Sequence, residues 1–118
     1  MSCIAGTYNI TCDQGATLHK SISWNNSANS PYNLTGYSAR MQVRPTVDST
    51  TVILELTTGN GRITLGSTEY NISLLVSASV TDGLTPGLYV YDLEIVSPSG
   101  VVDRILEGNF KVKAGVTR

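Results

Sequence analysis

The stretch GLYVYDLEIVSPSGVVDRILEGNFKVK, residues 87–113, predicts a long β-hairpin and decides the fold class. Apolar and polar residues alternate on both sides of SPSG, residues 97–100. Alternation with a period of two is typical of a β-strand that buries one face. In SPSG, proline presets φ at the second position of a reverse turn, and glycine follows. We therefore expect residues 88–96 and 101–113 to pair as antiparallel strands.

The two faces of this hairpin are predicted to differ in polarity. The inward face is expected to carry Tyr89, Tyr91, Leu93 and Ile95 from the first strand and Phe110 and Val112 from the second. On the outward face, Asp92 and Glu94 point the same way, and Arg104 is placed to balance them directly or diagonally. Two carboxylates at this spacing are also compatible with a glycosidase couple or a metal site. The charge-balanced outer face is the preferred interpretation.

Alternation with the same period recurs along the rest of the chain. It covers residues 7–13, 16–24, 36–44, 51–58, 62–66 and 70–77. Clusters of turn-forming residues separate these segments, such as NNSANSPYN at 25–33 and GNG at 59–61. Residues 78–87 break the pattern and are expected to hold one helical turn that ends at Gly83. About eight short strands without a long amphipathic helix predict an all-β protein, an antiparallel sandwich or barrel.

Size and composition favour one domain whose surface is poor in ions. The chain has 118 residues and a net charge of -1, so it has no basic field to attract nucleic acid or anionic lipid. Charged residues make up 14%, against roughly 25% in an average domain. Hydroxyl and amide side chains replace them and are less costly to desolvate under a partner than ions are. We expect a single domain over residues 1–118, with 1–6 and 114–118 as extended ends.

The two cysteines, Cys3 and Cys12, do not form a disulfide framework. Cys12 follows the apolar register of Tyr8 and Ile10, so a buried thiol is preferred, and a Cys3–Cys12 bridge stays open. The sequence has no basic and apolar leader and no run of about 18 apolar residues, so we expect a soluble chain made in a cytoplasm. Chance accounts for the N-x-Ser/Thr triplets at Asn9, Asn25, Asn33 and Asn71.

The residue inventory gives little support to catalysis. The single histidine, His19, lies on the polar side of its strand and is interpreted as an exposed strand residue. There is no G-x-S-x-G elbow, and one histidine with two cysteines is too few for the usual zinc site. Acidic calcium loops and glycine-rich phosphate cradles are also absent. We expect no enzyme activity, no catalytic residue, no cofactor and no metal.

The candidate interface residues are Arg40, Arg44 and Tyr32. The two arginines share the polar face of the strand at residues 36–44, about 13 Å apart at ~3.3 Å per residue. A nucleic-acid platform needs interleaved aromatic residues and a larger basic patch, which this strand lacks. A solvated face and a contact with a protein partner stay open, because arginine is favoured at protein interfaces. Tyr32, in the preceding loop, is the aromatic candidate for contact with a sugar or receptor.

Four stretches of the chain occur in an order found in small structural domains of tailed bacteriophages. They are DQGAT at 13–17, NLTGY at 33–37, GLYVYDLE at 87–94 and EGNFKV at 107–112. The chain resembles this family and is similar to the N-terminal domains of phage baseplate upper proteins. Asn33 stands where the family usually has aspartate, and asparagine also caps turns through its side chain.

This resemblance implies an immunoglobulin-like β-sandwich of about 7–8 strands. It further implies a non-enzymatic structural protein of the virion, made in the bacterial host and present in many copies per particle. Its partners would be other phage structural subunits, most simply those of the tail or baseplate. Two alternatives stay open: a capsid decoration (cement) protein on the phage head, and a carbohydrate- or receptor-binding module. No membrane or nucleic-acid partner is implied.

Overall fold

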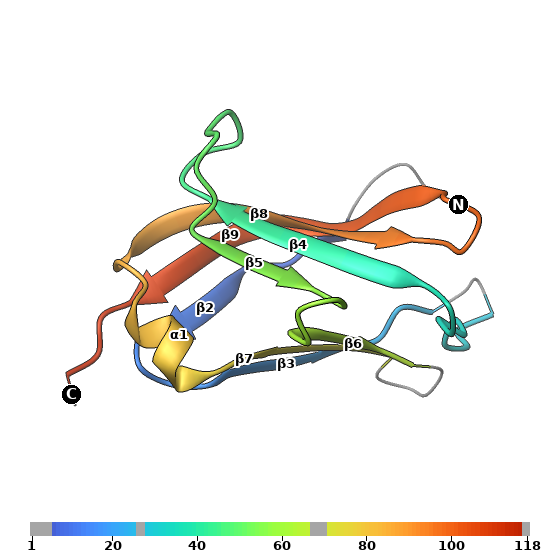
Figure 1. The fold of residues 1–118 in the computed structure, drawn as a ribbon, viewed down its shortest axis with the longest axis horizontal. Helices are drawn as coiled ribbons and strands as arrows, with labels where there is room; N and C mark the ends of the chain where they lie inside the picture. The colour runs from blue at the N-terminus through green and yellow to red at the C-terminus, as the bar shows by residue number, and fades with distance from the viewer. Residues whose placement is uncertain (1–5, 26–27, 67–70, 117–118) are drawn as a thin grey trace.

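The computed structural model describes residues 6–25, 28–66 and 71–116, which form two β-sheets stacked face to face (Figure 1). The larger sheet contains β1 (Gly6–Thr7), β2 (Ile10–Asp13), β9 (Val102–Lys113), β8 (Gly87–Val96), β4 (Ser38–Arg44) and β5 (Leu54–Thr57). The smaller sheet contains β3 (Leu18–Ile22), β7 (Ile72–Val76) and β6 (Ile63–Leu65), and one short helix, α1 (Ala78–Asp82), precedes β8. The expectation of an all-β protein is therefore confirmed.

The predicted hairpin is formed by β8 and β9, which pair antiparallel from Gly87↔Val112 to Val96↔Val102. Gly100 closes the turn with φ of 92° and donates its N–H to the carbonyl of Ser97. The register shifts once, because Leu93 pairs with Leu106 whereas Glu94 pairs with Arg104. The residue left over, Ile105, is a β-bulge that packs against the core. Beyond the bulge, Arg104 lies directly opposite Glu94 on the outer face.

The N-terminal edge of the larger sheet differs from the antiparallel arrangement that was expected. Both β1 and β2 pair with β9 in parallel, from Gly6↔Leu106 to Asp13↔Lys113. Between them the chain steps at Tyr8 and Asn9, and the Asn9 side-chain oxygen accepts the N–H of Asn109 at 3.0 Å. An alternating pattern fixes which face of a strand is buried but not the direction in which the strand pairs. Periodicity therefore could not predict that β1 and β2 run parallel to β9.

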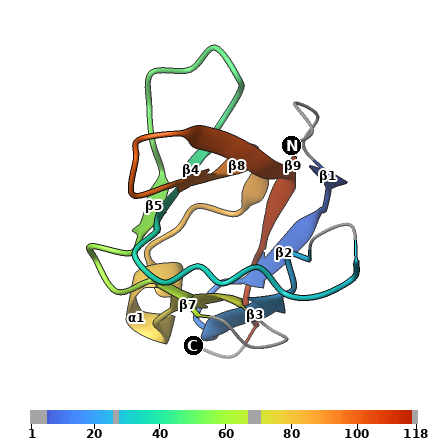
Figure 2. The same cartoon turned by 90° about the vertical axis from the view of Figure 1, so that its right-hand side faces the viewer.

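Figure 2 shows the two sheets from a second side, and the buried core residues come from strands of both. The inward residues predicted for the hairpin are buried, apart from Tyr89, which is partly buried against the core. Phe110 and Tyr91 meet edge to face, with ring centroids 6.4 Å apart. Cys12 is a free, buried thiol, as preferred from the sequence, and Cys3 lies outside the described residues. Leu34, in a loop, is 1% exposed and belongs to the same core, which the strand pattern did not predict.

The expected helical turn is α1, which Gly83 ends as predicted. Its Thr81 is buried and ties the helix to the turn between β2 and β3. The Thr81 hydroxyl accepts the N–H of Gly15 at 3.1 Å and donates to the carbonyl of Ala16 at 2.7 Å. Nearby, the Gln14 side-chain amide donates to the carbonyl of Leu84 at 2.9 Å. These bonds hold the two sheets together at one end of the sandwich.

The chain ends agree only partly with expectation. Gly6 was expected to belong to an extended end but pairs with Leu106 in β1. Residues 114–116 follow β9 without regular structure, whereas 1–5 and 117–118 lie outside the described residues. Tyr70, which was expected to belong to the strand at residues 70–77, also lies outside the described residues. Among the described residues, no helix is long and apolar enough to cross a membrane.

Candidate interface on the outer face of the larger sheet

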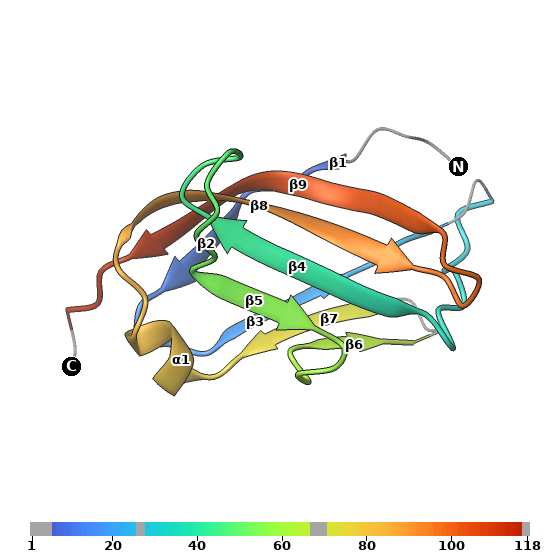
Figure 3. The same cartoon turned by 45° about the horizontal axis from the view of Figure 1, so that its top comes forward.

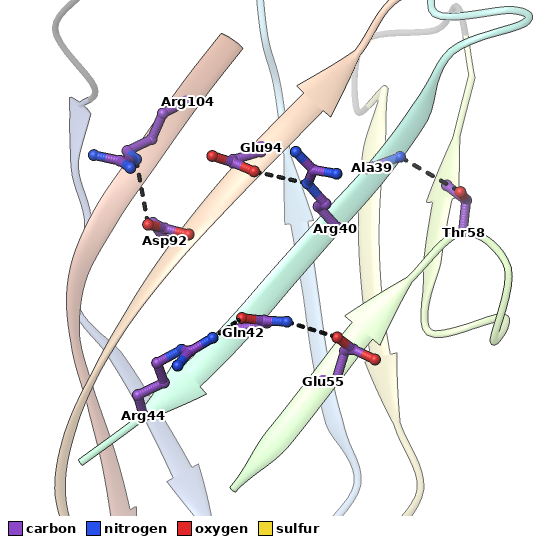
Figure 4. A network of polar contacts seen from close by, with 9 residues as sticks. All are labelled: Ala39, Arg40, Gln42, Arg44, Glu55, Thr58, Asp92, Glu94 and Arg104. Atoms are coloured by element: carbon purple, nitrogen blue, oxygen red, sulfur yellow. Dashed lines mark hydrogen bonds and ion pairs between the residues drawn. The ribbon is translucent and has the colours of Figure 1, made fainter. Parts of the chain in front are cut away.

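Arg40 projects from the outer face of β4 and is paired within the chain. Its Nε lies 2.7 Å from Glu94 Oε1 on the neighbouring strand, and the two residues face each other in the β4–β8 register (Figure 4). The Arg40 side chain is 55% exposed, so the pair contributes at most about 1 kcal/mol. Glu94 also faces Arg104 on its other side. Positive, negative and positive charges therefore alternate across β4, β8 and β9.

Arg44 is half-buried and supports the loop between β4 and β5. Its Nη1 donates to the carbonyl of Ser49 at 2.6 Å, and its Nη2 donates to the side-chain oxygen of Gln42 at 2.6 Å. The amide of Gln42 in turn donates to Glu55 at 2.8 Å (Figure 4). The loop rises beside the outer face of the sheet (Figure 3). Arg44 is thus used inside the molecule, an arrangement that neither interpretation of the strand pattern anticipated.

The next row across the sheet carries an uneven charge. Gln42 faces Asp92, and Asp92 faces Glu107 on β9. Arg104 reaches Asp92 diagonally at 3.2 Å, which confirms the predicted balance of that carboxylate. Within the three described stretches of chain, Glu107 forms no ion pair. Two carboxylates therefore stand directly opposite each other, an arrangement that is unfavourable in a sheet.

The pKa of Asp92 reports this environment. Burial raises the pKa of its carboxyl above the usual value, Arg104 lowers it, and Glu94 and Glu107 raise it. Arg44 adds a smaller lowering effect. The net result is a raised pKa, so the ionised form of Asp92 is disfavoured even with Arg104 beside it.

A groove of about 490 Å³ lies over these strands. Its lining comprises Gln42, Arg44, Val47, Val90, Tyr91, Asp92, Glu94, Arg104, Glu107, Gly108 and Asn109. A smaller hollow of about 300 Å³ shares part of this lining and extends to Arg40. The supported loop contributes Val47, which is 83% exposed, and the sheet contributes the half-buried Val90. The face is therefore concave, with an apolar side and a charged side.

Tyr32 is not part of this groove. It is half-buried and packs against Trp24, with ring centroids 4.5 Å apart. Asn71 holds both residues: its side-chain amide donates to the carbonyls of Trp24 and Tyr32 at 2.8 and 3.0 Å. Asn71 is 1% exposed, a role that its position in an N-x-Ser triplet did not reveal. The structure thus brings Arg40 and Arg44 to one face and places Tyr32 elsewhere.

The remaining candidate groups lie apart from one another. His19 is exposed on β3, with its Nε2 3.4 Å from the hydroxyl of Ser73. Burial, with a smaller effect of Asp13, raises the pKa of the Cys12 thiol. In the part of the chain that the structure describes, no group of three or more His, Cys, Asp or Glu side chains is placed to hold a metal.

No protein-family model matches the sequence, and a comparison with curated proteins gives no significant match. The all-β fold of two sheets and the geometry of this outer face are therefore the basis for the function proposed below.

Proposed function

We propose that the chain is an immunoglobulin-like β-sandwich that acts as a non-enzymatic structural module of a tailed-phage particle, docked on tail or baseplate subunits. The strand order supports the finer fold. The path β9-β8-β4-β5, with β2 added on β9, has the order GFCC′ of a variable-type immunoglobulin sheet, and β3-β7-β6 has the order BED. The hydroxyl of Tyr89, at the start of β8, donates to the carbonyl of Thr85 at 2.6 Å, like a tyrosine corner.

The observation that carries the proposal is the place that the phage-like stretches take in the fold. Gly15 in DQGAT and Gly36 in NLTGY both have φ of 83°, a conformation that favours glycine. In EGNFKV, a Cβ at position 108 would lie 2.5 Å from the Tyr8 carbonyl oxygen. GLYVYDLE is the central strand that carries the inward tyrosines. The glycines in these stretches therefore set the course of the backbone, and the tyrosines face inward. This supports a shared fold rather than a shared active site.

The distribution of polar groups supports docking through a face of the sheet. The backbone N–H of Thr58 donates to the carbonyl of Ala39 on β4. Successive N–H groups of an extended chain point to opposite sides, so the N–H of Thr57 points to the open edge of β5. Asn60 accepts that N–H at 3.0 Å and donates to the carbonyl of Glu55 at 3.1 Å. Arg62 donates to the same carbonyl at 2.8 Å. The chain thus blocks this edge against strand addition and leaves the concave face open.

Analysis of purified particles tests the proposal. Mass spectrometry of phage particles from cells that produce this chain should detect it at constant stoichiometry. A copy number that is a small multiple of three or six would place it in the tail, and hundreds of copies would place it on the head as a decoration protein. Absence from purified particles would overturn both placements. The sugar-binding alternative depends on Tyr32, whose ring is half-buried against Trp24 and offers only a partial platform.

A further inference from the structure

Three carboxylates and two guanidinium groups line the groove on the outer face. Arg104 is paired with Asp92, and Arg44 is bonded to Ser49 and Gln42. Both guanidinium groups that line the groove are therefore already engaged. Of the three carboxylates, Asp92 is paired with Arg104 and Glu94 with Arg40 at the margin of the groove, whereas Glu107 has no ion pair among the described residues.

The groove also has an apolar side. Val47 stands on the loop with 83% of its area exposed, and Val90 forms part of the floor between Arg44 and Asn109. The Arg44–Ser49 bond fixes the loop that carries Val47. An occupant that touches both sides of this groove must therefore combine an apolar stem with a cationic end. Lysine and arginine side chains have that form.

We propose that the groove receives a lysine or arginine side chain from a neighbouring protein subunit. The cationic head lies between Asp92 and Glu107, which face each other across β8 and β9. The aliphatic stem lies against Val47 and Val90. This inference rests on the proposed docking function and names the chemistry of the partner.

Charge complementarity favours this occupant over an anion or a neutral sugar. A cation beside the unpaired Glu107 gains an attraction and offsets the repulsion between Glu107 and Asp92, whereas an anion would add a fourth negative charge to the lining. Burial is the largest cause of the raised pKa of Asp92, and the neighbouring carboxylates Glu94 and Glu107 add to it. A bound cation should therefore move the titration of the Asp92 carboxyl to lower pH.

NMR titration of the whole chain tests the proposal without a known partner. The probe is N-acetyl-arginine amide, and its control is N-acetyl-citrulline amide, which has nearly the same shape and no charge. Arginine amide should shift the backbone amide signals of residues 47, 90–92 and 107–109 in a concentration-dependent way, and citrulline amide should not. The Asp92 carboxyl signal should titrate at lower pH in the presence of arginine amide.

Matched variants locate the effect. Glu107→Gln should reduce the arginine-induced shifts at least about twofold, because one of the two facing charges is lost. Asp13→Asn removes an equal charge from an exposed residue of β2 outside the groove and should leave the shifts unchanged. Equal shifts with arginine and citrulline amides, or equal shifts in Glu107→Gln, would overturn the proposal. Shifts with neutral saccharides alone would replace it with sugar binding.

Incorporation into particles separates this inference from the proposed function. Glu107→Arg should lower the copy number in particles, whereas Asp13→Asn should not. If the chain is present in particles but arginine amide does not bind, the groove proposal fails and the virion role stands. If arginine amide binds but purified particles lack the chain, the virion role fails and the groove remains a site for a basic partner.

Discussion

At the scale of single residues, Tyr91 connects three strands. Its ring is inside the sandwich next to Phe110, and its hydroxyl donates to the carbonyl of Tyr8 at the step between β1 and β2. Gly108 lies directly opposite Tyr91 in the β8–β9 register and has no side chain to separate Tyr8 from β9. The hydroxyl therefore adds a side-chain bond to the backbone pairing of β1 and β2 with β9.

Tyr91→Phe should destabilise the fold by about 1 kcal/mol, because the Tyr8 carbonyl loses its side-chain donor. Denaturant unfolding at neutral pH measures this loss. Tyr89→Phe is the comparison variant and should destabilise the fold less, because it removes a more exposed hydrogen bond, to the carbonyl of Thr85, at the start of the same strand. An unchanged unfolding midpoint in Tyr91→Phe would contradict the assigned role.

The pH dependence of Tyr91 has a defined sign. Burial raises the pKa of its phenol from 10.0 to about 12, with a smaller contribution from Tyr8. The folded state therefore holds this proton more tightly than the unfolded chain. The resulting stability is complete below pH 10 and is lost as the pH rises towards 12. In an absorbance titration, the phenol ionisation near pH 12 should disappear in Tyr91→Phe.

The sequence predicted single residues well where one face alone decides their position. Phe110, Val112 and Leu93 are inward because a strand has a period of two, and Arg104 balances Asp92 because the two strands pair. The same reasoning could not assign Arg40 and Arg44. Their partners, Glu94 and Ser49, depend on the register of a distant strand and on the path of a loop. Neither is encoded in the local pattern.

At the scale of elements, the turn at NLTGY sets the entry to β4. Tyr37 donates its N–H to the carbonyl of Leu34, the Asn33 side chain accepts the N–H of Thr35, and Gly36 has φ of 83°. The turn closes over the buried Leu34 and lies against the hairpin turn, since a Cβ on Gly36 would approach Pro98 at 3.4 Å.

Gly36→Val should lower stability by about 1–3 kcal/mol, because a β-branched residue is strained at positive φ. The matched control is Gly66→Val, since Gly66 has open space around it and no positive φ. Thermal unfolding of the two variants gives the comparison. If both melt alike, the backbone of the turn adapts to the new side chain and the requirement for glycine is wrong.

The edge of β5 offers a second prediction about an element. Asn60→Ala removes the groups that satisfy the Thr57 N–H and, with Arg62, the Glu55 carbonyl. The open edge should then pair with another molecule, because unpaired strand groups are a template for association. Sedimentation should show concentration-dependent association of Asn60→Ala, whereas Asn29→Ala, in the loop before β4, should remain like the parent chain. A monomeric Asn60→Ala would mean that other features protect this edge.

Element type was predictable from the sequence, but pairing direction and irregularity were not. The alternation in TYNITCD predicted that Ile10 and Cys12 are buried, and they are. It carried no information that β2 runs parallel to β9, because both directions bury the same face. The bulge at Ile105 has the same character. Ile105 is apolar and packs against the core, so nothing in the local sequence marks it as the extra residue of a bulge.

At the scale of the whole molecule, the two sheets are interleaved in sequence. Strands β1 to β4 come before the loop at residues 45–53, and β5 to β9 come after it. Yet β4 lies between β5 and β8, β3 pairs with β7, and β2 pairs with β9. Each sheet therefore needs both halves of the chain. One domain remains a prediction, which a cut in the loop can test.

Thermolysin should make its first internal cut at the Thr46–Val47 bond, because Val47 is 83% exposed on the loop that rises from the sheet. The two pieces should stay together on size exclusion and unfold in one transition, since the core between the sheets uses residues from both. Arg44→Lys should increase the cutting rate, because lysine cannot bond Ser49 and Gln42 at once. Separation of the pieces, or two unfolding transitions, would mean that the halves are stable units and that one domain is the wrong description.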